Sequence, residues 1–371
     1  MSKTLQDYAT LINDTIQSNE INHYITTDNM CQNLGGIDTF KNINIPQGKV
    51  RSFQKDDILL SNIRLYFRKV YRAKQKGGCS SDVLVFRAKH IDSATLFAIL
   101  SSQIFTDYAC SGSQGSKMPR GNKTHMMNFK IPTINFTIAK IFNSIQNKIE
   151  NNHKINELLH KILELLYEQY FVRFDFLDEN NKPYQTSGGK MKFSKELNRL
   201  IPNDFEVKTL GELTQLKVGN KNANHSSNQG KYPFFTCSNN PLKCETYQFE
   251  GKHIIISGNG NFYVTHYDGK FDAYQRTYVV NPNNPNHYVL IYLFVKSYTN
   301  YLKLQSRGSI IKFITKSDIE NIKIVLPNLK TYTKWNNVLK IIENNNQSTQ
   351  TLTALRDFLL PLLLKQQVKP K

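Results

Sequence analysis

Residues 149–152, Ile-Glu-Asn-Asn, recur unchanged as residues 342–345, and this duplication decides how the chain folds. The same separation of 193 positions relates residues 128–131 (Asn-Phe-Lys-Ile) to residues 321–324 (Asn-Ile-Lys-Ile). Towards the N-terminus the separation grows to 195, 196 and finally 205, as loop insertions in diverged copies would produce. The sequence therefore predicts two copies of one unit, each a domain followed by a helical segment.

Each copy begins with short apolar runs separated by turn signals, which predict strands. The runs are residues 58–60 and 83–86 in the first copy, and 253–257, 262–266 and 277–280 in the second. Asn-Gly and Asp-Gly pairs, which favour hairpin turns, separate the runs of the second copy. A short helix is predicted after the strands, at residues 94–108 and 287–301. Each domain should therefore mix helices and strands.

A long helix closes each copy, predicted in the first from about residue 138 to residue 170. Apolar residues recur there at alternating spacings of three and four, the pattern of a coiled coil. We expect the interface to be formed by Ile141, Ile145, Asn152, Ile155, Leu159, Ile162 and Leu166, and by Val338, Ile341, Asn345, Leu352, Leu355 and Leu359. The two helices are expected to pair antiparallel.

Asn152 and Asn345 occupy the same heptad position in the two helices. A buried Asn in a coiled coil lowers stability but fixes the register and the choice of partner. The alternative is that both residues face solvent at the edge of the seam. The sequence leaves these two readings open.

The predicted fold class is α+β: two mixed α/β domains separated by two long antiparallel coiled-coil helices, with a pseudo-twofold internal repeat. We place the first domain at residues 1–132 and the first spacer helix at 133–178. The second domain follows at 179–327, with 179–205 as a linker, and the second spacer helix at 328–371.

Composition limits the possible partners. The chain has 371 residues, enough for two or three domains, and carries 48 Lys and Arg against 29 Asp and Glu. The resulting net charge of +19 favours a polyanion, nucleic acid before an acidic membrane surface. An apolar content of 39% with 11% aromatic residues excludes a disordered basic tail, because such tails lack the residues that form a core.

Five cysteines stand at positions 31, 79, 110, 237 and 244, and none of them forms a Cys-x-x-Cys pair. This spacing predicts reduced thiols rather than a disulfide framework, and no structural metal site. Residues 1–17 lack the apolar core of a signal peptide, and the apolar run 358–364 is too short to span a bilayer. We therefore expect a soluble, cytoplasmic protein.

No arrangement of residues predicts catalysis. Residues 281–283, Asn-Pro-Asn, lack the second proline and the aromatic residue of the adenine-methyltransferase loop that they resemble. Residues 258–260, Gly-Asn-Gly, are a weak nucleotide-loop signal, and the nine histidines show no metal-ligand spacing. We expect a non-catalytic chain.

Basic and aromatic residues gather in both copies, and Gly115 and Gly308 open equivalent loops with different contents. Arg and Lys neutralise phosphates, and Arg, Asn and Gln pair with base edges in the major groove. We expect DNA contacts from Arg64, Arg68, Lys69, Lys117, Arg120, Asn122 and Lys123, and from Asn259, Tyr263, Tyr274, Arg276, Arg307, Lys312 and Lys316. For most single lysines an ordinary solvated charge is the alternative.

Five runs resemble those of the specificity subunits of type I restriction–modification systems: residues 57–64, 77–80, 115–121, 232–238 and 269–278. The last run, Gly-Lys-Phe-Asp-Ala-Tyr-Gln-Arg-Thr-Tyr, is quite specific. The resemblance covers essentially the whole chain, and the family's alternation of two recognition domains with two helices matches the order found above.

The resemblance implies a function. In that family each domain reads one half of a bipartite, asymmetric double-stranded DNA site. Two modification subunits dock on the specificity subunit and methylate one adenine in each half, and restriction subunits join to cleave unmethylated DNA. S-adenosylmethionine, ATP and Mg are then expected on the partner subunits and not on this chain, in a prokaryotic cytoplasm. From another functional class, the alternative is a coiled-coil scaffold or RNA-binding protein without modification partners.

Overall fold

The computed structural model describes residues 3–39, 41, 43–131, 134–309, 311–327 and 332–363. Two compact units divide the chain, and each is described separately. Unit 1 comprises Met1–Ile155 and Asn344–Lys371, and unit 2 comprises Asn156–Glu343. Each unit therefore holds one domain and part of both long helices. No described helix combines the length and the apolarity needed to cross a bilayer.

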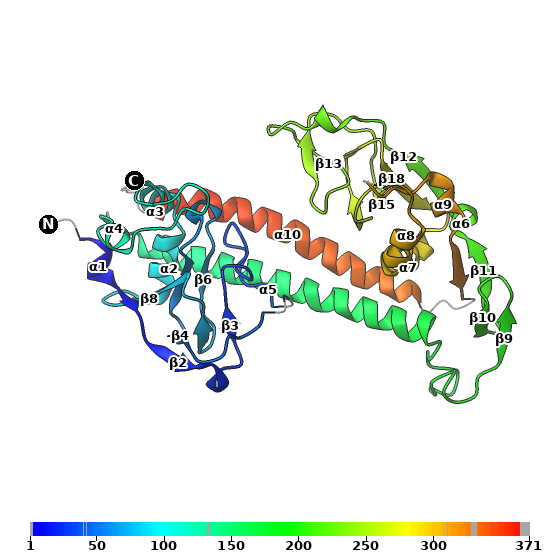
Figure 1. Ribbon diagram of the computed structural model, residues 1–371, viewed down its shortest axis with the longest axis horizontal. Helices are drawn as coiled ribbons and strands as arrows, with labels where there is room; N and C mark the ends of the chain where they lie inside the picture. Colours follow the sequence, from blue (N-terminus) through cyan, green and yellow to red (C-terminus); the bar gives the residue numbers. More distant parts are fainter. Residues whose placement is uncertain are drawn as a thin grey trace. The chain divides into compact units, whose positions relative to one another are not determined.

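Unit 1 is built around an antiparallel four-stranded sheet (Figure 1). Its strands, in spatial order, are β1 (Ala9–Ile12), β8 (Val83–Ala88), β5 (Ile58–Ser61) and β6 (Val70–Arg72). Strand β5 is buried along its whole length because both faces are covered. Ile58 and Leu60 pack into one core cluster with α2, whereas Leu59 points into a second cluster on the opposite face.

A second sheet of unit 1 joins β2 (Thr15–Gln17), β4 (Lys49–Phe53), β7 (Gly77–Cys79) and β3 (Tyr24–Ile25). The helices are α1 (Leu5–Tyr8), α2 (Ser93–Ser101), α3 (Gln103–Ser111) and α4 (Lys123–Met127), with 3-10 turns η1 (Ser18–Glu20) and η2 (Leu65–Phe67). Asp92 and Ser102 cap α2 and α3, because their side chains accept hydrogen bonds from backbone amides three residues on. The predicted helix 94–108 is thus two helices that meet at Ser102.

Unit 2 repeats this plan. Its antiparallel sheet is β12 (Thr214–Val218), β18 (Thr277–Pro282), β15 (Lys252–Ser257) and β16 (Val264–Asp268). A second sheet joins β14 (Leu242–Cys244), β13 (Tyr232–Phe235) and β17 (Asp272–Ala273), and two-stranded sheets join β11 (Glu206–Thr209) to β19 (Lys323–Leu326) and β10 (Arg199–Pro202) to β9 (Met191–Ser194). Its helices are α6 (Leu210–Leu213), α7 (Tyr288–Ser297), α8 (Thr299–Gln305) and α9 (Lys316–Glu320), with 3-10 turns η4 (Ala223–His225) and η5 (Pro285–His287).

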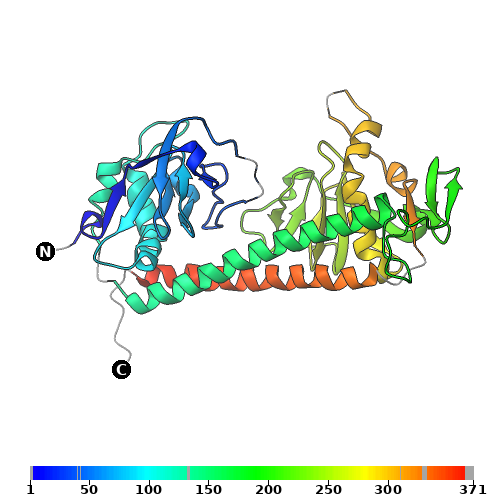
Figure 2. The same cartoon turned by 90° about the horizontal axis from the view of Figure 1, so that it is seen from below.

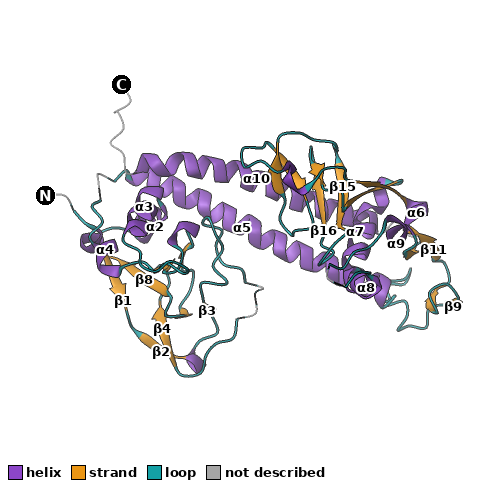
Figure 3. Ribbon diagram, turned by 45° about the horizontal axis from the view of Figure 1, so that its top comes forward, coloured by secondary structure: helices purple, strands orange, loops and turns teal. Residues whose placement is uncertain are grey.

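The main sheets of the two units have the same strand order in the same sequence of elements, so the repeat is real at the level of topology. Figure 3 shows the same mixture of strands and helices in both units. The middle strands match in packing as well. Ile254 and Ile256 of β15 enter one core cluster and Ile255 another, as in β5. The predicted fold class, two mixed domains with two long helices, is confirmed.

Two long helices follow the domains: α5 (Phe136–Tyr167) and α10 (Thr333–Leu363) (Figure 2). A π-helical turn, η3 (Glu168–Val172), follows α5. In unit 1, Asn152 bonds to Thr349 and Gln146 bonds to Arg356, so the residue numbers run in opposite directions along the pair. In unit 2, Asn156 Nδ2 donates to the carbonyl of Ile342 at 3.2 Å. The two helices therefore pair antiparallel.

The interface between the two helices differs from the predicted one. The predicted residues fall on two heptad positions, and those at one of the two positions are exposed. Ile145 and Asn152 are buried, and Leu159, Leu166, Val338, Asn345, Leu352 and Leu359 are half-buried. By contrast Ile141, Ile155, Ile162, Ile341 and Leu355 are exposed by 42–48%. The buried row of α5 lies one residue further on, at Phe142, Ile149, Asn156 and Leu163. Phe142 belongs to the core of the first domain and packs against Phe97, so the domain selects the row.

The exposed row leaves an apolar stripe on α5, formed by Ile155, Leu158, Ile162 and Leu165. Spacings of three and four place these residues on one face of the helix. Each side chain is 42–51% exposed.

Candidate nucleic-acid interface

The first loop, residues 115–121, is held by backbone hydrogen bonds at its base. Gly115 has a φ of +98°, a conformation that favours glycine. The amides of Gln114 and Arg120 donate to each other's carbonyls at 2.9 and 2.8 Å. The amide of Arg64 donates to Pro119, at 2.9 Å, so Arg64 is brought beside the loop.

Four of the predicted cationic residues gather at this first loop: Arg64, Lys117, Arg120 and Lys123. Arg64 Nη2 lies 3.4 Å from the carbonyl of Lys117. The Arg120 side chain is 60% exposed, and its guanidinium pairs with Asp82 at 3.0 Å. Asn122 caps α4 by accepting a hydrogen bond from the amide of His125. The loop thus carries cations and leads directly into a short, capped helix.

The second loop, residues 308–309 and 311–314, has the same backbone construction. Gly308 also has a φ of +98°. The amides of Arg307 and Phe313 donate to each other's carbonyls at 2.9 Å, and the amide of Ile314 donates to Gly258 at 3.0 Å. The first loop makes the equivalent contact through Gly121 and Asn62.

Four predicted residues meet around Phe313 at the second loop: Asn259, Arg276, Arg307 and Lys312. Arg276 lies over the Phe313 ring, with its guanidinium carbon 5.9 Å from the centroid. Asn259 pairs with Phe313 as an isolated bridge, and the carbonyl of Lys312 accepts from the amide of Gly260. The Asn259 Oδ1 atom is buried without a hydrogen-bond partner among the described residues.

Acidic side chains moderate the charge of the second loop. Arg307 pairs with Asp318 at 3.1 Å, and Lys316 pairs with Glu320 along α9 at 3.4 Å. Burial opposes ionisation of Asp318, but hydrogen bonds from Thr315 and the charge of Arg307 outweigh it and lower the pKa of this carboxyl. Asp318 is therefore a carboxylate at neutral pH, and Arg307 approaches a second anion only in competition with it.

Two of the predicted DNA-contacting residues point their side chains into their own domain. Arg68 Nη2 donates to the carbonyl of Ser101 at 2.9 Å, and Lys69 Nζ donates to Thr27 at 2.5 Å. Burial lowers the pKa of both side chains. Tyr274 is half-buried next to Lys221, whereas the Tyr263 side chain is 36% exposed and its hydroxyl accepts from Asn261.

Two residues that composition did not single out stand out on the loops. Met118 and Ile311 occupy equivalent positions, and their side chains are 55% and 62% exposed. Apolar side chains at such positions can contact the methyl group of thymine or enter a base step. The separation of 193 residues, applied to the loops as well as to the helices, pairs Met118 with Ile311 and could have identified both from the sequence.

Sequence comparisons find similarity to proteins that are described as DNA specificity subunits. Residues 202–355 match the family model described as a type I restriction modification DNA specificity domain. Over 132 residues the chain is 37% identical to the type I restriction enzyme EcoDI specificity subunit of Escherichia coli, covering 34% of this chain but only 28% of that protein. Over 302 residues it is 25% identical to the MjaIX specificity subunit of Methanocaldococcus jannaschii, covering 72% and 67%.

A solved structure shares the fold. The crystal structure of the S subunit of a type I restriction–modification system from M. genitalium matches with a TM-score of 0.63 at 16% identity. The match covers 99% of this chain and 96% of that one. The duplicated topology, the family model and the two relatives point the same way: the chain is similar to the specificity subunits of type I restriction–modification systems.

Proposed function

We propose that this chain recognises double-stranded DNA as the specificity subunit of a type I restriction–modification complex, with each domain reading one half of a bipartite, asymmetric site. The observation that carries the proposal is the pair of loops. Their backbones are fixed by equivalent hydrogen bonds, but Arg120 in the first loop is replaced by Phe313 in the second. The same loop backbone with two different sets of side chains suits the recognition of two different base sequences.

Affinity and selectivity come from different residues in this proposal. The excess of 48 basic over 29 acidic residues gives salt-dependent attraction to phosphates, which is blind to sequence. Arg120, Arg276 and Asn259 lie at the loops with the side-chain types that bond to base edges. Arg68 and Lys69 hold protein carbonyls and contribute to the domain instead.

The helices serve as spacer and docking site in the same proposal. The apolar stripe Ile155, Leu158, Ile162 and Leu165 has the spacing by which one helix packs on another. We propose that it takes helices of the modification subunits, which carry the methyl-transfer chemistry. The division into domains at 1–132 and 179–327, with spacer helices at 133–178 and 328–371, belongs to this proposal.

A gel-shift titration tests the DNA proposal. The full chain is mixed with a random double-stranded DNA pool and with duplex RNA at two salt concentrations, and bound DNA is sequenced after repeated selection. We expect DNA binding that weakens with salt, and enrichment of a two-part motif. An enriched motif with a single part would contradict one half-site per domain. Preference for RNA, or no enrichment, would favour the RNA-binding or scaffold alternative.

A matched pair of charge variants sharpens the selection. Lys117→Ala with Arg120→Ala removes two cations from the first loop, whereas Lys154→Ala with Lys161→Ala removes two exposed cations from α5. We expect the loop variant to lose only one part of the motif and the helix variant to keep both. Equal effects from the two variants would show that the loop acts through charge alone.

A further inference from the structure

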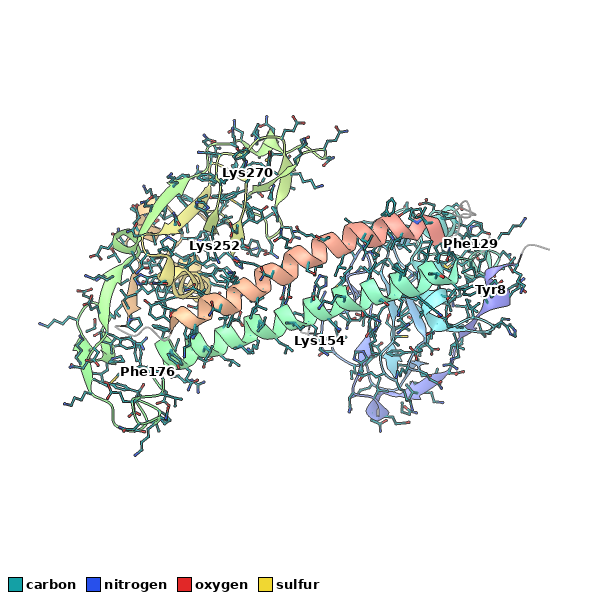
Figure 4. All side chains as sticks on the ribbon, turned by 180° about the vertical axis from the view of Figure 1, so that it is seen from behind. Tyr8, Phe129, Lys154, Phe176, Lys252 and Lys270 are labelled. Atoms are coloured by element: carbon teal, nitrogen blue, oxygen red, sulfur yellow. The ribbon has the colours of Figure 1, made fainter. Side chains whose placement is uncertain are left out.

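Three side chains with metal-binding chemistry meet in the second domain. They are His225 at the end of η4, Cys244 at the end of β14 and Asp272 at the start of β17. One donor atom from each lies within 4.8 Å of the other two. His225 Nε2 is 3.2 Å from Asp272 Oδ2. Lys270, labelled in Figure 4, marks the turn that leads into β17.

The register of the small sheet explains why these residues meet. Cys244 lies opposite Tyr232 on β13, and Asp272 lies opposite Phe234 on the other side of the same strand. Tyr232 and Phe234 are two residues apart, so the side chains of Cys244 and Asp272 project from the same face. The ring of His225 stands edge-on against Phe234, with centroids 5.4 Å apart, which directs it over that face.

The Asp272 carboxylate lacks a full set of partners. Its side chain is 0% exposed. Oδ2 accepts a hydrogen bond from the Thr246 hydroxyl at 2.6 Å and faces His225, but Oδ1 is buried without a hydrogen-bond partner among the described residues. A buried carboxylate is stable when a cation neutralises it, and the described ion pairs give it no Lys or Arg.

The same geometry argues against a nucleophilic triad. In a Cys–His–Asp arrangement the acid holds one ring nitrogen and the other faces the nucleophile. Here Nε2 alone faces both the Asp272 carboxylate and the Thr246 hydroxyl, at 3.2 and 3.0 Å. Cys244 is fully buried and donates to the carbonyl of Thr246 at 3.2 Å, so no substrate reaches its sulfur.

We propose that His225, Cys244 and Asp272 hold a structural divalent transition-metal ion of the zinc class. Imidazole nitrogen, thiolate and carboxylate are the ligands that zinc takes, and the Thr246 hydroxyl or a water completes four. Donor atoms about 2.0–2.3 Å from a tetrahedral ion lie roughly 3.3–3.6 Å apart. The 3.2 Å between His225 and Asp272 already fits this spacing. The Cys244 sulfur closes in as a thiolate when the ion displaces its proton, which is released to solvent.

The ion would fix a segment that includes two predicted DNA contacts. Tyr274 and Arg276 lie between β17 and β18, and this segment is tied to Lys221, whose carbonyl accepts a hydrogen bond from the amide of Gln275 at 2.9 Å. A bond from Asp272 to an ion that also holds η4 and β14 would anchor the start of this segment. The site concerns this chain's own folding, so it stands or falls independently of the DNA proposal.

Metal titration of the full chain tests the site. The protein is purified with a chelator, desalted and titrated with Zn²⁺ and separately with Co²⁺, whose absorption reports geometry and thiolate ligation. We expect one ion per chain, a tetrahedral Co²⁺ spectrum with a thiolate charge-transfer band, and a higher melting temperature with Zn²⁺. Loss of the band in Cys244→Ser, but not in the control Cys237→Ser, supports the site.

A second variant keeps the test valid if Cys244→Ser fails to fold. His225 is 25% exposed, so His225→Gln leaves the core intact, and it should weaken Zn²⁺ binding at least tenfold and remove the Zn²⁺-dependent rise in melting temperature. Absence of stoichiometric binding by the unaltered chain would overturn the proposal. Equal binding by His225→Gln and the unaltered chain would overturn it too.

Discussion

Asn152 and Asn345 occupy the same position in the two repeats, and they meet across the helix pair. The side-chain amide of Asn152 donates to the backbone carbonyl of Asn345 at 3.4 Å and to the hydroxyl of Thr349 at 3.1 Å. Asn152 is 1% exposed, which excludes the solvent-facing alternative for this residue, whereas Asn345 is half-buried. The buried amide of Asn152 thus ties the two copies of the repeat together in unit 1, in addition to the bond between Arg356 and Gln146.

The first prediction concerns this contact. Asn152→Ala removes its hydrogen bonds and leaves a small cavity, so we expect a loss of about 1–2 kcal/mol in the free energy of unfolding. Urea unfolding followed by circular dichroism measures it. The neighbouring Asn151 is exposed, and Asn151→Ala is the control, with an expected change below about 0.5 kcal/mol. Equal losses from both variants would mean that helix propensity, not the contact, sets the effect.

The second prediction separates the two half-sites. If Arg120 and Arg276 each read a base, Arg120→Ala relaxes the base preference of one half-site and Arg276→Ala that of the other, each by about 1–3 kcal/mol. Competition binding with singly substituted DNA duplexes measures the preferences. Arg120 is bound by Asp82, and Asp82→Asn is expected to tighten binding to all DNA sequences without changing the preference. A uniform loss over all duplexes would reduce either arginine to a phosphate contact.

The third prediction is a pH dependence. Burial first, and then the charges of His160, Lys252 and Lys296, lower the pKa of His266 from 6.5 to about 3. Glu343 lies 3.5 Å from its Nδ1 atom but is bound at 2.9 Å by Lys252, which Figure 4 labels. Because the unfolded chain binds this proton and the folded chain does not, stability is full above pH 6.5 and declines as the pH falls towards 3.

The measurement is a difference between two proteins. Between pH 6 and pH 4 the unaltered chain should lose about 1.4 kcal/mol per pH unit more than His266→Gln in urea unfolding. His153→Gln, which alters a half-exposed histidine of α5, is the control and should follow the unaltered chain. Parallel stability curves for His266→Gln and the unaltered chain would show that His266 is protonated in the folded state.

The fourth prediction tests the spacer role. Seven residues inserted in α5 after Ile155, and seven in α10 after Glu343, preserve the heptad seam and add about 10 Å to the paired helices. At about 3.4 Å per base pair the selected motif should gain roughly three base pairs between its halves. Insertion in α5 alone breaks the pairing and serves as the negative control. An unchanged motif in the double insertion would remove the spacer from the mechanism.

The repeat allowed much of the fold to be predicted, because separations of 193 to 205 residues give the main-sheet strands and the long helix of one copy counterparts in the other. The strand predicted at 253–257 is β15, and the run 277–280 lies in β18. The second sheets escaped prediction, since β3 has two residues and β7 three, and elements that short have no periodicity to detect.

Side-chain environment was harder to predict than topology. On α5 two apolar rows differ by one position, and only the domain packed against Phe142 decides which row is buried. Arg68 has the residue type of a phosphate contact, but the carbonyl of Ser101 lies within its reach. His225, Cys244 and Asp272 come from three distant segments, and no local spacing rule connects them.

The last helix of the chain completes the core of the first domain, since Leu360 and Leu363 of α10 belong to the same buried cluster as Leu5 and Phe142. During synthesis the ribosome delivers the first domain long before these two leucines emerge. Until then the apolar surface that these leucines cover lacks its partners, for the whole time that the second domain is being made.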